Sequence, residues 1–170
     1  MSRNIFIGLG SNVGDRLAFL DSAVRELGEL GRTKVVRASS VYETEPYGEK
    51  NQAEFLNMVV EIESELEPDE LLEEIKHFER KLGRRQTERW GPREIDLDIL
   101  YFGNTVLNGG ALRIPHPEVV RRRFVLAPLN EIAPSFVDPV RGQNVSELLR
   151  ACGDTCRVRK MEFTTGLQEH

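Results

Sequence analysis

The chain has 170 residues, a net charge of −5 and 39% hydrophobic residues, which suits one globular domain spanning residues 1–170. No apolar run approaches the roughly 20 residues that cross a bilayer, the first residues lack the pattern of a secretory signal, and the acidic balance argues against a general nucleic-acid binder. Cys152 and Cys156 are too few for a disulfide framework. We therefore expect a cytoplasmic protein without a membrane or nucleic-acid partner.

The first half of the chain shows strand and helix periodicity in turn. In chain order the patterns predict a strand at 4–9, a glycine-rich turn at 8–14, a helix from Asp15, a strand at 34–44, a polar loop at 45–52 and an alternating strand at 54–64. The glycine turn does not fit G-x-G-x-x-G, because its third glycine falls one residue late, so we interpret it as a tight strand-to-helix connection.

The second half continues the mixture. In chain order the patterns first predict a helix from Pro68 to a Gly83 cap, an arginine-rich loop, a strand through Asp96 and Asp98, and a hairpin turn at 103–104 with its return at 105–107. They then predict a rigid link at 114–117, a partly helical segment at 125–132, a helix from Asn144 or Ser146, and a strand at 158–163. The hairpin and the 34–64 pair favour a mixed α+β fold with antiparallel neighbours over a doubly wound parallel sheet.

Asp96 and Asp98 carry the strongest chemical signal in the chain. They lie two positions apart among strand-forming residues, so their side chains point to one face about 6–7 Å apart, and they repel each other unless a cation lies between them. Residues 80–93, just upstream, hold six bases and one acid. Paired acids beside arginines predict magnesium that carries a polyphosphate; the alternative is a solvated acidic strand edge.

Phe55 and Asn57 form a second pair, on the face of their strand opposite Leu56 and Met58. An aromatic ring beside a carboxamide suits a flat heterocycle that forms hydrogen bonds, whereas the alternative is a sheet buried on both faces. His116, between two prolines, is either a phosphate contact or a structural histidine. Trp90 is either a core residue or one that braces the arginines around it or borders a nucleotide.

Several short motifs spread over most of the chain complete this pattern. They are Gly10-Ser11-Asn12, Gly14-Asp15-Arg16, Ser39-Ser40-Val41-Tyr42-Glu43-Thr44, Phe55-Leu56-Asn57, the signature Arg89-Trp90-Gly91-Pro92-Arg93-Glu94-Ile95-Asp96-Leu97-Asp98-Ile99-Leu100, Pro115-His116-Pro117, Arg122, Phe124-Val125-Leu126, Pro128-Leu129 and Ile132-Ala133-Pro134. With them the chain resembles the 6-hydroxymethyl-7,8-dihydropterin pyrophosphokinase family of folate biosynthesis.

The resemblance implies a ferredoxin-like three-layer αβα sandwich that transfers the β,γ-diphosphate of ATP to the hydroxymethyl group of the pterin and releases AMP. We expect a monomer rather than an oligomer. It implies that Asp96 and Asp98 bind two Mg²⁺ ions and act in catalysis with Arg84 and Arg93. The ATP contacts it implies are Glu79, Arg84, Trp90, Arg93, Ile99, His116 and Arg122. The pterin contacts it implies are Thr44, Pro46, Tyr47, Phe55, Asn57, Asp96 and Phe124. Glu45, where many relatives have proline, and Tyr47, where an aliphatic residue is common, depart from the pattern.

Two other functions stay open from the residues alone. A magnesium-dependent nucleotidyltransferase would use the Gly10-Ser11 turn with the aspartates, although more than eighty residues separate them here. A ferredoxin-like RNA-binding module is disfavoured by the acidic balance and by the lack of an aromatic and basic strand motif. Release of pyrophosphate instead of AMP would indicate nucleotidyl transfer, and salt-dependent RNA binding without ATP turnover would indicate the RNA-binding module.

Overall fold

The computed structural model describes residues 3–45, 54–82 and 95–161. The strands are β1 (Arg3–Ser11), β2 (Thr33–Ala38), β3 (Tyr42–Thr44), β4 (Phe55–Ser64), β5 (Asp96–Phe102), β6 (Leu107–Gly109), β7 (Leu112–Ile114) and β8 (Val158–Lys160). The helices are α1 (Arg16–Glu29), α2 (Pro68–Lys81), the 3₁₀ helix η1 (Val119–Arg121), α3 (Arg123–Ile132) and α4 (Val145–Ala151). Within these ranges no helix has the length and apolar character that a bilayer crossing requires.

One antiparallel sheet organises the chain. Its strands lie in the order β5-β1-β4-β3-β8, and β2 pairs with β4 on the same edge as β3, further along the strand. Each of these pairings is antiparallel. The prediction of a mixed α+β fold with a mainly antiparallel sheet is therefore confirmed.

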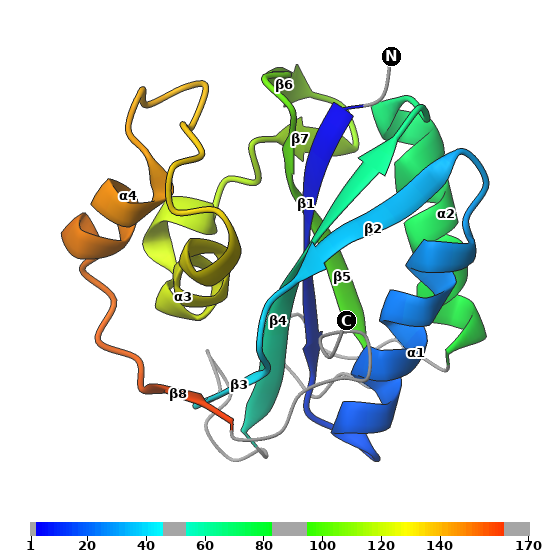
Figure 1. The fold of residues 1–170 in the computed structure, drawn as a ribbon, viewed down its shortest axis with the longest axis horizontal. Helices are drawn as coiled ribbons and strands as arrows, with labels where there is room; N and C mark the ends of the chain where they lie inside the picture. Colours follow the sequence, from blue (N-terminus) through cyan, green and yellow to red (C-terminus); the bar gives the residue numbers. More distant parts are fainter. Residues whose placement is uncertain (1–2, 46–53, 83–94, 162–170) are drawn as a thin grey trace.

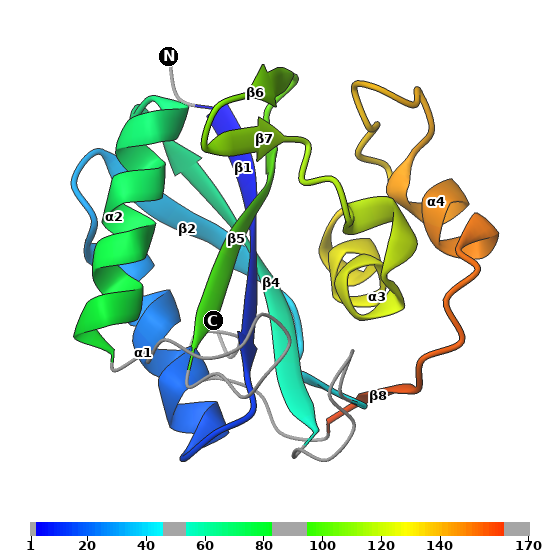
Figure 2. The same cartoon turned by 180° about the vertical axis from the view of Figure 1, so that it is seen from behind.

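Helices cover both faces of the sheet. Helices α1 and α2 lie on one side and α3 and α4 on the other, as the two opposite views show (Figures 1 and 2). Alternation along β1 supplies both layers, because Ile5 and Ile7 pack in the cluster beneath α1 and α2 whereas Phe6 packs toward α3. The two buried clusters fix the sheet between the helical layers and leave its end near Thr44 and Asp96 free to form a pocket.

Local signals explain where the helices begin. Asp15 is the N-cap of α1, and its side chain accepts a hydrogen bond from the Ala18 N–H at 3.1 Å. Pro68 opens α2 behind a capping box formed by Glu67 and Glu70. Asn144 caps α4 in the same way. These three starts agree with the sequence patterns, whereas the Gly83 cap lies outside the described residues.

The strand predicted at 34–44 is wrong as one element, because it divides into β2 and β3. At the break, one of the two hydrogen bonds between Ser39 and Val59 uses the Ser39 side chain. Its N–H donates to the Val59 carbonyl at 2.9 Å, but the Val59 N–H donates to the Ser39 hydroxyl instead of a carbonyl, also at 2.9 Å. A side-chain acceptor in place of the main chain interrupts the ladder.

Two further expectations are corrected. β1 continues to Ser11, so Gly8 and Gly10 lie within a strand and not in the turn that follows it. The predicted hairpin return at 105–107 is also wrong, because β6 pairs with β7. The carbonyl of Leu100 in β5 accepts instead from the His116 N–H at 2.9 Å, so the segment after β7 takes this position beside β5.

Candidate active site

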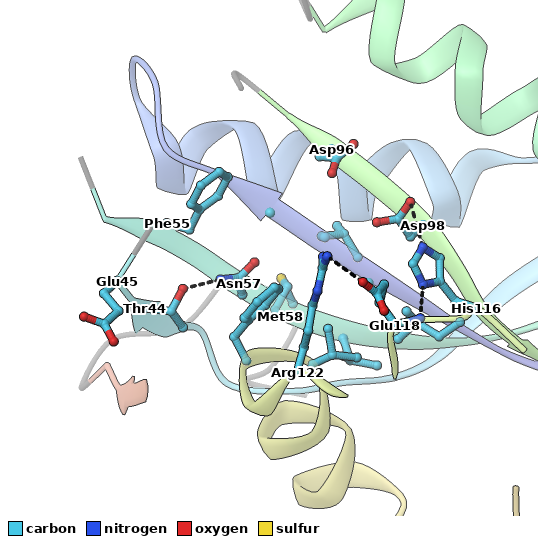
Figure 3. A pocket seen from close by; sticks show the side chains of 17 residues that line it. Thr44, Glu45, Phe55, Asn57, Met58, Asp96, Asp98, His116, Glu118 and Arg122 are labelled. Carbon is cyan, nitrogen blue, oxygen red and sulfur yellow. Dashed lines mark hydrogen bonds and ion pairs between the residues drawn. The ribbon is translucent and has the colours of Figure 1, made fainter. Parts of the chain in front are cut away.

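A pocket opens on the face of the sheet that carries α3, with an empty volume of ≈ 860 Å³. Residues from six parts of the chain line it: Gly8, Leu9, Gly10, Thr44, Glu45, Phe55, Asn57, Met58, Val59, Asp96, Asp98, Leu100, His116, Glu118, Arg122, Phe124 and Val125. Figure 3 shows the charged groups near Asp98 at one end and Thr44, Asn57 and Phe55 at the other. The pocket thus has an ionic end and an aromatic end.

The two glycines of β1 form the floor between these ends. Gly10 pairs with Asn57 of β4 on one side and with Asp96 of β5 on the other, and Gly8 pairs with Val59 and Asp98 in the same way. Residues two apart on a strand share a face, so both glycines remove a side chain from the middle of the floor. A Cβ on Gly10 would lie 2.8 Å from Asn57 Oδ1. The hollow exists because these positions have no side chain.

Asp96 and Asp98 both face this pocket, as their spacing along β5 predicts. The pKa of Asp98 is raised to about 7, first by removal from water and then by the negative charges of Asp96 and Glu79. Its side chain is still 47% exposed, so water screens part of this effect. The shift follows from burial of acids that lie close together; the positive charges of Lys76 and Arg122 offset it only in part.

His116 and Arg122 face the aspartates from the opposite wall (Figure 3). The Glu118 N–H donates to His116 Nδ1 at 3.1 Å, so in the neutral ring the proton is on Nε2, which lies 3.9 Å from Asp98 Oδ1. Burial and the positive charge of Arg122 lower the pKa of His116. The neutral imidazole therefore presents an N–H donor to the pocket.

The aromatic end is built by the ends of β3 and β4 and by the start of α3. Asn57 Nδ2 donates to Thr44 Oγ1 at 2.7 Å, and both residues are buried. Phe55, the first residue of β4, lies on the same strand face as Asn57, and Phe124 lines the pocket from α3. The Arg122 guanidinium lies 5.7 Å from the centre of the Phe124 ring, which connects the two ends.

Two predicted residues do not line the pocket. Glu79 is 2% exposed, and its Oε2 accepts from the Leu97 N–H at 2.9 Å on the edge of β5 away from β1. Ile99 belongs to the cluster beneath α1 and α2 on the opposite face of the sheet. The predicted contacts Pro46, Tyr47, Arg84, Trp90 and Arg93 lie outside the described residues.

Sequence reasoning missed several lining residues. Gly8 and Gly10 carried a usable signal, because glycines two apart in a strand empty one of its faces. Glu118 carried no such signal, since an acid two residues after a histidine is common on any surface. Leu100 and Val125 are apolar walls that a pattern cannot tell from core.

Comparisons with known proteins show which family this chain belongs to and which solved structures share its fold. Residues 6–134 match the sequence model of the family described as 7,8-dihydro-6-hydroxymethylpterin-pyrophosphokinase (HPPK). A Bacillus subtilis protein named 2-amino-4-hydroxy-6-hydroxymethyldihydropteridine pyrophosphokinase is 48% identical over 132 residues, 78% of this chain and 79% of that protein. A protein of the same name from Aquifex aeolicus is 40% identical over 143 residues, 84% of this chain and 88% of that protein.

Solved structures share the fold at low sequence identity. An HPPK-DHPS crystallised in complex with substrates superposes with a TM-score of 0.71 at 15% identity, over 88% of this chain. The wild-type HPPK-DHPS of Plasmodium falciparum with STZ-DHP gives a TM-score of 0.72 at 17% identity, again over 88% of this chain. This chain spans 43% of each of those two longer chains.

Proposed function

This chain belongs to the 7,8-dihydro-6-hydroxymethylpterin-pyrophosphokinase family, and on that premise we propose how its pocket divides between the two substrates. Its activity is the pyrophosphokinase step of folate biosynthesis, in which the diphosphate of ATP passes to the hydroxymethyl group of the pterin and AMP leaves. The main support is that one pocket has charged residues at one end and aromatic residues at the other, with Gly8 and Gly10 between them.

The ionic end takes the phosphates of ATP. Asp96 and Asp98 are the residues that hold magnesium there, two ions by the family resemblance, because hard carboxylate oxygens are its preferred protein ligands. When bound, magnesium offsets phosphate charge and orients the transferred group.

The aromatic end takes the pterin. Phe55 and Phe124 supply ring faces for stacking on a flat heterocycle, and Asn57 with Thr44 supplies hydrogen-bonding groups at its edge. Burial of both polar residues supports this assignment, because a buried amide recognises a partner more selectively than a solvated one. We assign Pro46 and Tyr47 to this end and Arg84, Trp90 and Arg93 to the ATP end by resemblance alone.

The protein's own groups bind and orient the reactants. The pterin alcohol attacks the β-phosphorus in line, its hydroxyl proton passes to water, and the bond from that phosphorus to the oxygen of AMP breaks. Arg122 neutralises charge on the phosphates, and His116 donates its Nε2 proton in a hydrogen bond. A histidine in this tautomer cannot accept a proton at Nε2, so His116 serves as a donor and not as the general base.

Replacing Asp98 by alanine tests the ionic end. We expect Asp98→Ala to slow the transfer step by about 100-fold or more while the protein stays folded, since an electrostatic contact at the reacting phosphates is lost. The measurement is a single-turnover assay with Mg²⁺, ATP and 6-hydroxymethyl-7,8-dihydropterin, with AMP and the pterin diphosphate ester quantified.

Asp69→Ala is the matched control, because Asp69 is an exposed acid in the first turn of α2. It should leave the rate unchanged. A near-normal rate for Asp98→Ala would remove the assignment of the ionic end. Pyrophosphate in place of AMP in the wild-type reaction would indicate nucleotidyl transfer and overturn the reaction itself.

We also propose the finer organisation of the molecule. Two helical layers around one sheet support a ferredoxin-like αβα sandwich, and residues 1–170 then form one catalytic domain. A pocket lined by residues of this one chain supports a monomer. Two free cysteines agree with a reducing cytoplasm.

A further inference from the structure

Glu118 lies in the ionic end of the pocket. It is next to His116 and Arg122, the two residues that face the aspartates. Its Oε1 accepts from Arg122 Nη2 at 3.3 Å, and its Oε2 lies 3.6 Å from Arg121 Nη1. The two arginines differ in setting, since the side chain of Arg122 is 13% exposed and that of Arg121 is 75% exposed. The contact with Arg122 is thus the sheltered one, and it is made inside the pocket wall.

The two parts of Glu118 act on different neighbours. Its main-chain N–H donates to His116 Nδ1 and sets the tautomer of that ring, whatever the side chain at position 118. Its carboxylate binds the Arg122 guanidinium, which also lies 5.7 Å from the centre of the Phe124 ring. The guanidinium is therefore contacted by a carboxylate and by an aromatic ring, and substitutions of the Glu118 side chain remove the carboxylate while the Phe124 ring remains.

We propose that Glu118 is a positioning residue that holds the Arg122 guanidinium in the orientation in which it binds the phosphates of ATP. A free arginine side chain samples many rotamers, and a planar fork held in place loses less entropy when it binds phosphate. This inference rests on the proposed assignment of the ionic end to ATP.

The carboxylate could have the opposite effect. An acid beside a phosphate site repels phosphate, so a purely electrostatic role predicts that its removal strengthens ATP binding. A positioning role predicts that removal weakens ATP binding and slows transfer. The sign of the change therefore separates the two roles.

The experiment compares Glu118→Ala with Glu118→Gln by steady-state kinetics in both substrates. We expect Glu118→Ala to lower kcat/KM for ATP by about tenfold, the effect of one lost charge-assisted hydrogen bond, and to leave the KM for the pterin within about twofold. Glu118→Gln keeps an acceptor oxygen and should recover most of the loss. Arg121→Ala removes the exposed partner of the same carboxylate and should change neither parameter.

A double-mutant cycle with Arg122→Ala shows whether Glu118 acts through that arginine. If it does, adding Glu118→Ala to Arg122→Ala causes no further loss. An additive loss, equal losses for both substrates, or tighter ATP binding by Glu118→Ala would each overturn the inference. If the alanine variant is less well folded, Glu118→Met carries the cycle, because it keeps most of the side-chain volume and removes the carboxylate. A wild-type enzyme that forms no pterin diphosphate would instead reject the proposed function.

Discussion

At the scale of single residues, Gly10 sets the shape of the pocket by what it lacks. It lies between Asn57 and Asp96 in the register of the sheet, so it separates the two proposed substrate ends. The Asn57 carboxamide donates through Nδ2 to Thr44 and directs Oδ1 toward the Gly10 Cα. The orientation of this amide therefore depends on the empty position beside it.

Gly10→Ala should impair pterin binding selectively. The new Cβ would lie 2.8 Å from Asn57 Oδ1, a distance at which the carboxamide must turn and weaken its 2.7 Å bond to Thr44. We expect the KM for the pterin to rise by about tenfold, roughly one hydrogen bond, with little change in the KM for ATP. Gly31→Ala is the control, because its Cβ would meet nothing within 4 Å. A parallel rise in both KM values would refute the selective role.

At the scale of elements, β8 and Arg157 just before it support the aromatic end, although both lie beyond the residues 6–134 that match the family. The Arg157 N–H donates to Glu45 Oε1 at 3.1 Å, and the Glu45 N–H donates to the Arg157 carbonyl at 3.4 Å. The Arg157 side chain also binds Glu54. Arg157 thus joins the residue after Thr44 to the residue before Phe55.

Arg157→Ala should raise the KM for the pterin modestly. The main-chain pairing of β8 with β3 persists and the lost ion pair is exposed, so we expect the pterin KM of the variant to be about two- to threefold that of wild type at low salt. At high salt the ion pair is screened in the wild type too, so the two KM values should become equal. The measurement is pterin KM at low and high ionic strength. Arg150→Ala, which removes only an exposed contact with Ser146, serves as the control. A change confined to kcat would speak against a role in holding the pterin end.

The elements that the sequence predicted well are those with local causes. Alternation identified β4, and Asp15 and Pro68 marked the starts of α1 and α2 because caps act on neighbouring residues. The break after β2 was missed because it depends on the Ser39 hydroxyl replacing a carbonyl opposite Val59, a partner twenty residues away. The pairing of β6 was missed for the same reason, since a turn signal does not name its partner strand.

At the scale of the whole molecule, the pocket exists because the strand order differs from the chain order. β1 lies between β4 and β5, which brings Asn57 near the aspartates forty residues later, and the segment through His116 returns to the same face. Alternation predicted which face each pair of residues shares, but it could not predict that these faces meet. Resemblance to a family predicted that these residues form one site, but it did not predict that Glu118 lines the pocket.

The same assembly makes stability depend on pH and metal. The pKa of Asp98 is raised to about 7 by removal from water and by the charges of Asp96 and Glu79. Between about pH 4 and pH 7 the folded protein therefore keeps a proton that the unfolded chain has released. The contribution of Asp98 to the free energy of unfolding consequently falls as pH rises through this window.

Asp98→Asn should therefore stabilise the metal-free protein at high pH only. Asparagine does not ionise, so the free energy of unfolding of the variant, relative to wild type, should grow by about 1 kcal/mol between pH 4 and pH 8. This is less than the pKa shift of Asp98 alone corresponds to, because the side chain is 47% exposed and water screens its charge. Urea denaturation at both pH values measures this difference. At pH 8, Mg²⁺ at ten times its Kd should add about 1.4 kcal/mol to the wild type and less to the variant, because binding to the folded state adds RT ln(1 + [L]/Kd). A difference between variant and wild type that stays constant across this pH range would show that the carboxyl of Asp98 titrates normally in the folded protein.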